Sequence, residues 1–138
     1  MLEEIRERRS IRKFTNEDVD DQTLNQIIEM GAWAPSGLNN QPWRLVIVKD
    51  GKKAGEISNY TRYKSIVENA PLLIAVFLDA EASYDRDKDI MSVGAFIQNI
   101  LLATHARGLG AVWLGEILKQ KERVREALQL PEVYELMA

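Results

Sequence analysis

The chain has 138 residues, of which 46% are hydrophobic and 28% are charged. These values lie near the average of globular proteins and predict one domain, 1–138, rather than a disordered chain, a coiled coil or a fibre. The formal net charge of −3 argues against a nucleic-acid partner, and the lack of cysteine excludes disulfides and thiolate catalysis. No apolar signal segment opens the chain, and the longest apolar run (71–78) is far shorter than the ~20 residues of a membrane span. We therefore expect a cytoplasmic protein with no membrane partner.

The first third of the chain predicts two helices and a loop. Residues 2–9 favour a helix, and residues 10–14 favour an extended exit from it. Asp20 or Asp21 is a candidate N-cap for a second helix, because a short acidic side chain can accept from its first free N–H groups. Helical spacing assigns the second helix a buried face formed by Leu24, Ile27, Ile28 and Ala32.

The middle of the chain predicts two buried strands and a long helix. A loop at 35–42 leads to a strand at 45–48, which ends at a turn, and a charged stretch with helical character follows. The run 71–78 is apolar throughout, which predicts a strand covered on both faces. The helix predicted over 87–107 is apolar on more than one side, which predicts a central or interfacial position. Its main stripe consists of Ile90, Val93, Ile97, Ile100, Leu101 and Thr104.

The last part predicts a third strand at 111–114, a short helix at 119–128 and the start of a strand at 134–138. Helices and strands are interspersed along the whole chain. We therefore predict an α+β fold, in which helices cover a mixed, mainly antiparallel sheet in a three-layer α/β/α arrangement.

Several common kinds of chemistry are disfavoured by the sequence. His105 is the single histidine, so a catalytic triad or a histidine-based zinc site is not expected, and we predict no metal site. Asp85, Asp87 and Asp89 imitate the start of a calcium loop, but the glycine and glutamate that such a loop requires are missing. These three residues are interpreted as a solvated helix start.

Four cations and a hydroxyl fall together where the first helix gives way to extended chain. This segment reads Arg8-Arg9-Ser10-Ile11-Arg12-Lys13-Phe14. Arginines hold phosphate groups by charge-assisted hydrogen bonds, so the segment is a candidate anion site. An ordinary solvated charged face is the alternative, and nearby glutamates favour it.

Two further segments have a composition suited to ligand binding. The loop from Ala34 to Trp43 (APSGLNNQPW) places small polar groups between two prolines, which suits it to the edge of a planar heterocycle. The segment from Gly108 to Glu116 (GLGAVWLGE) has glycines that allow close approach of the backbone to a flat ligand. A structural turn and a helix stop followed by a strand are the respective alternatives.

These three segments, in this order and spacing, resemble the nitroreductase family of flavoproteins over essentially the whole chain. The resemblance implies an FMN-dependent oxidoreductase that works as a homodimer, with FMN bound at the interface. It also implies NADH or NADPH as co-substrate and nitroaromatic, quinone or flavin-like electron acceptors. The flavin then carries the chemistry, so no catalytic side chain is required.

The resemblance also implies roles for individual residues. Arg8 corresponds to a phosphate ligand, Arg9 and Ser10 lie beside the ribityl chain and phosphate, and Arg12 lies near the pyrimidine edge. Asn59 corresponds, less securely, to an asparagine at the same edge. Loop residues that reach the flavin of the partner subunit correspond to Pro35, Ser36, Gly37, Asn39 and Gln41. The backbone beside flavin N5 corresponds to Leu114, Gly115 and Glu116.

The chain departs from the family pattern at its end. Family members continue past the strand that begins near Tyr134, and their tail crosses to the partner subunit, so we expect weaker FMN binding and a weaker dimer here. Alternative interpretations are a relative with dehalogenase or flavin-consuming chemistry, and a flavin-binding protein without turnover. Substrate choice is expected to depend on variable segments such as 59–66.

Overall fold

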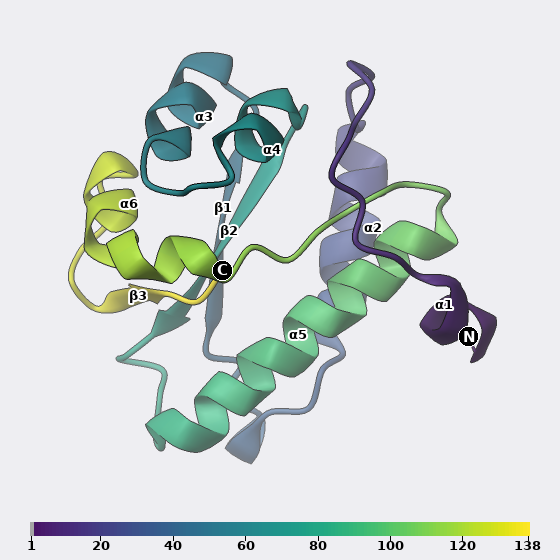
Figure 1. Cartoon of the computed structure of the whole chain (residues 1–138). Helices are drawn as coiled ribbons and strands as arrows, with labels where there is room; N and C mark the ends of the chain where they lie inside the picture. The colour runs from purple at the N-terminus through teal and green to yellow at the C-terminus, as the bar shows by residue number, and fades with distance from the viewer. Residues whose placement is uncertain (1) are drawn as a thin grey trace.

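The computed structural model describes residues 2–138 as a small sheet with helices on both faces (Figure 1). The strands lie in the order β1-β2-β3. The elements along the chain are α1 (Leu2–Glu7), α2 (Asp21–Ala32), η1 (Gly37–Asn39), β1 (Trp43–Val48), α3 (Gly51–Ser58), α4 (Lys64–Asn69), β2 (Leu73–Asp79), α5 (Arg86–Ala106), η2 (Glu116–Gln120), α6 (Lys121–Ala127) and β3 (Tyr134–Leu136).

The sheet is antiparallel throughout. β1 pairs with β2 in a register that joins Trp43 to Leu78 and Val48 to Leu73. β2 pairs with β3 over a shorter length, in which Phe77 faces Leu136. In Figure 1, α2 and α5 lie on one side of the sheet and α3, α4 and α6 on the other. The predicted α+β, three-layer class is therefore confirmed.

β2 separates two hydrophobic cores, because its side chains alternate between the two faces of the sheet. Val76 and Leu78 pack with Phe96 and other α2 and α5 residues. Phe77 faces the other way, against Val67, Val124 and their neighbours. The predicted strand at 71–78 is thus covered on both faces.

The helix pair α2 and α5 supports the first core. Asp20 is the N-cap of α2, where its side chain accepts from the Thr23 N–H. The predicted buried face of α2 was partly wrong, because Gly31 is buried and Ala32 is exposed. A Cβ at Gly31 would lie 2.8 Å from the Phe96 ring, so glycine permits the close approach of α5.

The segment at 111–114 does not form the predicted strand. It makes one isolated parallel bridge, between Ser10 and Ala111, and otherwise runs as extended chain across the end of the first core. Beyond this bridge, residues 112–114 belong to none of the three strands of the sheet. Within residues 2–138, no helix is both long and apolar enough to cross a bilayer.

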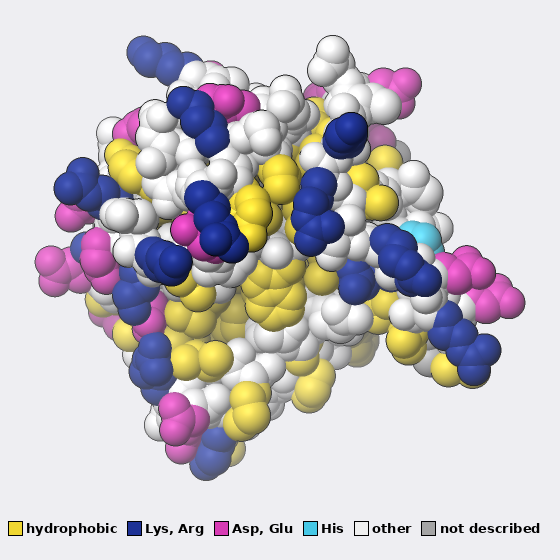
Figure 2. Space-filling model, in the orientation of Figure 1, with side chains coloured by type: hydrophobic (Ala, Val, Ile, Leu, Met, Phe, Trp, Pro, Cys, Tyr) yellow, Lys and Arg dark blue, Asp and Glu magenta, His cyan; other side chains and the backbone are white. Residues whose placement is uncertain are grey.

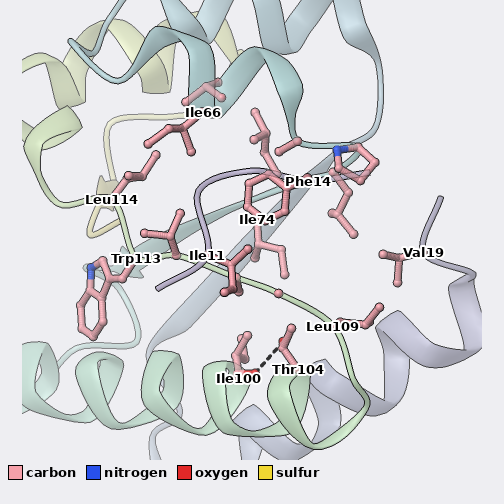
Figure 3. Close-up of a pocket in the computed structure, with 18 of the residues that line it drawn as sticks. Ile11, Phe14, Val19, Ile66, Ile74, Ile100, Thr104, Leu109, Trp113 and Leu114 are labelled. Carbon is pink, nitrogen blue, oxygen red and sulfur yellow. Dashed lines mark hydrogen bonds between the residues drawn. The ribbon is translucent and has the colours of Figure 1, made fainter. Parts of the chain in front are cut away.

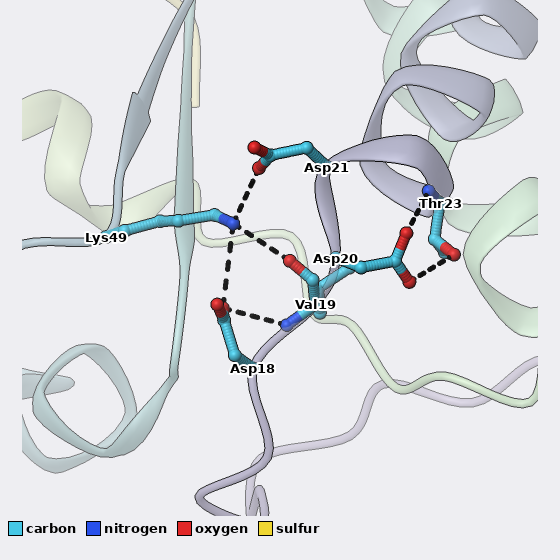
Figure 4. A network of polar contacts seen from close by, with 6 residues as sticks. All are labelled: Asp18, Val19, Asp20, Asp21, Thr23 and Lys49. Carbon is cyan, nitrogen blue, oxygen red and sulfur yellow. Dashed lines mark hydrogen bonds and ion pairs between the residues drawn. The ribbon is translucent and has the colours of Figure 1, made fainter.

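An ion-pair network ties the segment before α2 to the end of β1 (Figure 4). Lys49 Nζ donates to Asp21 and to the Val19 carbonyl, each at 2.9 Å, and lies 3.6 Å from Asp18. The hydrogen bond to Asp21 holds the pKa of Lys49 above its usual value, because only the charged amine donates fully. The network fixes the extended chain between α1 and α2 against the sheet.

Candidate functional site

The basic segment after α1 lies along the segment that follows α5. Ser10 bridges to Ala111, and the Ile11 N–H donates to the Ala111 carbonyl at 3.0 Å. A Cβ at Gly110 would lie 2.8 Å from Ile11, so this backbone contact requires glycine. Two of the three segments that were predicted to bind a ligand are therefore held side by side.

The arginines of this segment are available to an anion. Arg8 is half-buried, whereas Arg9 and Arg12 are exposed. The Arg9 side chain donates to the carbonyls of Arg6 and Arg8, and the Arg12 side chain donates to the carbonyl of Ser10. Among the described residues, none of the ion pairs includes Arg8, Arg9, Arg12 or Lys13.

A small cavity of about 140 Å³ lies beside these arginines. Arg8 and Arg9 line it, together with the acidic Glu7 and with Leu101 and His105 from the last turns of α5. Charged side chains next to a hollow of this size suit the phosphate end of a ligand.

The loop at 35–42 has a strained backbone. Leu38, Asn39 and Gln41 have positive φ values of 55°, 54° and 46°, which are uncommon for residues other than glycine. Ser36 Oγ accepts from the Gln41 N–H at 3.0 Å, and the Gln41 side chain donates to Asn39 Oδ1 at 3.0 Å. Such a conformation persists only when the surrounding structure holds it.

The residues that precede and begin α5 provide that support. Asn40 Nδ2 donates to the Ala82 carbonyl at 3.0 Å and to Asp89 Oδ1 at 2.9 Å. The Tyr84 ring lies so close to Gly37 that a side chain at Gly37 would overlap it. The loop is therefore fixed to the N-terminal end of α5.

A third cluster forms around Glu116, at the start of η2. Glu116 Oε2 accepts from Thr61 Oγ1 at 2.7 Å and from the Arg62 N–H at 3.2 Å. The hydrogen bond from Thr61 is the main reason why the pKa of Glu116 lies below its usual value. Asn59 donates to the Gly55 carbonyl and accepts from Lys64. Thr61 and Arg62 are thus held against the side chain of Glu116.

The predicted site residues fall into two groups within one chain. The basic segment, the 110–116 segment and residues 59–62 form a continuous series of contacts. Pro35, Ser36, Gly37, Asn39 and Gln41 lie apart from them, at the opposite end of α5 (Figure 1). Asp89, which holds the loop, precedes Leu101, which lies beside the arginines, by about 18 Å along the helix at 1.5 Å per residue.

A larger hollow of the molecule is apolar and lies beside the first residues of β2, which β3 does not pair. This cavity, of about 500 Å³, is lined by Ile11, Phe14, Ile74, Ile100 and Leu109 among others (Figure 3). In Figure 2, hydrophobic side chains gather in the hollow between the two halves of the molecule, and Lys and Arg side chains flank it. Leu114 is the predicted site residue that lines it. Its mostly apolar lining does not suit a phosphate, whereas Arg8 and Arg9 border the smaller cavity.

Two polar residues at the loop were missed by the sequence analysis. Asp89 is not solvated, as was predicted, but fully buried, and Asn40 was absent from the predicted loop ligands. Asp89 lies four residues before Val93, on the buried stripe of α5, so an acidic residue in an apolar stripe was the available signal. No group of three or more His, Cys, Asp or Glu residues within 2–138 could hold a metal ion.

The chain matches one family model and is similar to nitroreductases and to a deiodinase. The model of the Nitroreductase family matches residues 5–64 and 52–138. An NADH dehydrogenase/NAD(P)H nitroreductase of Archaeoglobus fulgidus is 34% identical over 95% of this chain and 77% of its own length. An iodotyrosine deiodinase of Thermotoga neapolitana is 30% identical over 78% of this chain and 69% of its own length. A solved structure of a nitroreductase in complex with FMN, from Desulfovibrio desulfuricans, is 47% identical with a TM-score of 0.95, covering 99% of this chain and 81% of that one.

Proposed function

The chain belongs to the nitroreductase family, and we propose that it is an FMN-dependent oxidoreductase that passes two electrons from NADH or NADPH to a small-molecule acceptor. The observation that carries the proposal is the likeness to the FMN-bound nitroreductase, at 47% identity and a TM-score of 0.95. The relative from Archaeoglobus fulgidus has NAD(P)H in its name, which supports the electron donor.

The residues of the basic segment fit the phosphate of FMN. Arg8 and Arg9 border the small cavity, and neither side chain has an acidic partner among the described ion pairs. A phosphate can therefore bind without displacing an existing ion pair. Gly110 supplies the second point of fit, because its missing side chain lets this segment lie against the chain that leads to Gly115.

We assign the parts of the cofactor to residues along this series of contacts. Arg8 holds the phosphate, Arg9 and Ser10 lie beside the phosphate and ribityl chain, and Arg12 lies near the pyrimidine edge. When bound, FMN supplies two-electron chemistry by accepting and donating hydride. The guanidinium of Arg12 is a fixed positive charge that stabilises negative charge developing on a reduced ring. The Leu114–Glu116 backbone and Asn59 complete the proposed ligand set.

The separation of the two groups of site residues supports a homodimer. The arginines of the same chain lie at the opposite end of α5 from the loop residues Pro35, Ser36, Gly37, Asn39 and Gln41. We propose that the loop of each subunit reaches the flavin held mainly by the other, and that α5 lies in the interface. Exposed apolar side chains near the loop fit such a contact: Trp33, Leu38 and Met91 are 73%, 85% and 68% exposed.

The proposed electron acceptors are small molecules. Nitroaromatics, quinones and free flavins fit an open, flat site, and the deiodinase relative favours reductive dehalogenation as the second candidate. Residues 59–66, of which Thr61 and Arg62 contact Glu116, are the segment expected to select among them.

An anaerobic titration tests the proposal. The purified protein is loaded with FMN, its visible absorbance is followed on addition of NADH or NADPH, and a nitroaromatic, a quinone, free flavin or a halogenated tyrosine is then added. Bleaching followed by recovery supports the enzyme, and the acceptor that restores the colour fastest identifies its class. Bound FMN that never bleaches indicates a binding protein, and failure to bind FMN contradicts the proposal.

Sedimentation at low micromolar concentration, with and without FMN, tests the shared site. A dimer is expected in the presence of FMN. A monomer that still holds one FMN per chain would overturn the shared arrangement.

A further inference from the structure

The carboxylate of Asp89 is the most completely buried acidic group among the described residues, with 0% of the residue exposed. It occupies the first turn of α5, where the neighbouring acid Asp87 is exposed. Burial of a charge is costly unless hydrogen bonds replace the lost water. Its partners therefore indicate what the buried charge holds in place.

Four hydrogen bonds converge on this carboxylate. Oδ2 accepts from Ser83 Oγ at 2.6 Å, from the Tyr84 N–H at 3.0 Å and from the Asp85 N–H at 3.3 Å. Oδ1 accepts from Asn40 Nδ2 at 2.9 Å. Three of these donors belong to the turn that enters α5, and the fourth belongs to the strained loop at 35–42.

Asn40 is the link between this carboxylate and the loop. Its amide also donates to the Ala82 carbonyl, and its own N–H donates to the Gly37 carbonyl at 3.0 Å. The residues on either side, Asn39 and Gln41, have positive φ values of 54° and 46°. Without the contact to Asp89, the side chain of Asn40 would lose one of the two hydrogen bonds that hold that backbone against the start of α5.

We propose that Asp89 is a positioning residue: through Asn40, it fixes the loop of Ser36, Asn39 and Gln41 in the orientation needed to meet the flavin of the partner subunit. Asp89 itself touches neither cofactor nor substrate. The inference rests on the proposed function for its consequence, but the effect on the loop is a property of the chain alone.

The first experiment compares Asp89→Asn with Asp87→Asn, which removes the same charge from the same turn of α5 at an exposed position. Hydrogen exchange of the Asn39, Asn40 and Gln41 amides is measured without FMN, and FMN affinity and the visible circular dichroism of bound FMN are measured afterwards. Asp89→Asn is expected to speed exchange in the loop and to weaken FMN binding about tenfold, the size of one lost charge-assisted hydrogen bond, with an altered dichroism spectrum. Asp87→Asn is expected to match the wild type.

The second experiment is a double-mutant cycle. Asn40→Asp alone places two carboxylates against each other and is expected to weaken FMN binding more than Asp89→Asn does. Adding Asp89→Asn to Asn40→Asp restores one donor between the two positions, so the same substitution is expected to improve binding in that background. Asp89→Asn is thus expected to weaken FMN binding in the wild type and to strengthen it in Asn40→Asp. Such a reversal indicates a direct contact between positions 40 and 89, and the FMN dissociation constants of the four proteins measure it.

Ser83→Ala keeps the Asp89 carboxylate and removes one of its donors, so it replaces Asp89→Asn in the experiment if that variant does not fold. It is expected to shift loop exchange and FMN affinity in the same direction by a smaller factor. Equal loop exchange in the Asp89→Asn, Asp87→Asn and wild-type proteins would overturn the proposal. A wild-type protein that binds no FMN would instead contradict the proposed function, and the exchange measurements would still decide the role of Asp89.

Discussion

The basic segment at 8–14 and the loop at 35–42 are built in opposite ways. The basic segment is mostly exposed and is held by backbone contacts to Ala111, and its arginines have no ion-pair partner among the described residues. The loop is held from inside by its own hydrogen bonds and from outside by Asp89 and Ala82, which accept from Asn40, and by the Tyr84 ring beside Gly37. The first region offers charge, which acts over a distance and tolerates motion, whereas the second offers shape, which requires a fixed backbone.

Removing Arg8, the residue proposed to bind the phosphate, should reduce FMN affinity more than any other change in the basic segment. Arg8→Ala is expected to weaken FMN binding by about 10- to 100-fold, because a charge-assisted contact contributes about 1.5–3 kcal/mol. Isothermal titration of FMN into the apoprotein measures the change. Lys13→Ala removes a charge from the same segment and is expected to have a smaller effect, so equal dissociation constants for the two variants would remove Arg8 from this role.

The contact at Gly110 tests whether the basic segment needs a fixed support as the loop does. Gly110→Ala forces Ile11 away from the 110–116 segment, at a cost of about 1–3 kcal/mol for an overpacked contact, and is expected to weaken FMN binding by up to about tenfold. Gly55→Ala is the matched control, because a Cβ at Gly55 would meet no atom within 4 Å. Limited proteolysis near residue 10 should increase in the first variant alone.

A substitution at Arg12 tests whether its positive charge affects the reduction potential of FMN without affecting FMN binding. Arg12→Gln is expected to leave FMN bound and to lower its two-electron reduction potential by about 30 mV or less, equivalent to at most about 1.4 kcal/mol. The reason is that a positive charge near the ring stabilises the reduced, negatively charged form. Redox-dye equilibration under anaerobic conditions gives the potential, and a value equal to that of the wild type would contradict the proposed location of Arg12.

The pH dependence of stability tests the loop support without any cofactor, and its effect should be the smallest. Burial raises the pKa of Asp89, but hydrogen bonds from Ser83, Asn40 and the backbone outweigh it and leave the pKa below its usual value. The stabilisation is therefore present at neutral pH and is lost as the pH falls below the ordinary aspartate value of about 3.9. The charged neighbours Asp85 and Lys88 are present in the wild type and in Asp89→Asn, so they do not account for a difference between the two proteins.

Urea unfolding of wild type and Asp89→Asn between pH 7 and pH 3 measures this loss. The wild-type free energy of unfolding should fall more steeply below pH 4, by up to about one proton per molecule in the linkage slope. Parallel slopes would mean that the carboxylate carries no net stabilisation.

The sequence predicted elements better than it predicted their pairing. The stripe of α5 and the apolar run of β2 follow simple periodicities, so both were found to within a few residues. The segment at 111–114 has strand composition but no partner strand of sufficient length, which a local pattern cannot reveal. Asp89 was misread for the same reason: its burial depends on Asn40, which lies 49 positions away in the sequence.

The site was predictable where residue type alone carries the chemistry, as in the arginines of the basic segment. That the loop and the arginines lie at opposite ends of α5 could not be predicted, because it depends on how α5 packs in three dimensions.

The position of β2 between two cores also bears on how the protein unfolds. Val76 and Leu78 belong to one core and Phe77 to the other, so the same strand contributes side chains to both cores. Loss of either core removes the backing that the other core needs, and neither half retains a complete hydrophobic interior by itself. We therefore expect the two halves to melt in a single cooperative transition, with the slowest-exchanging amides of both cores opening at the same free energy.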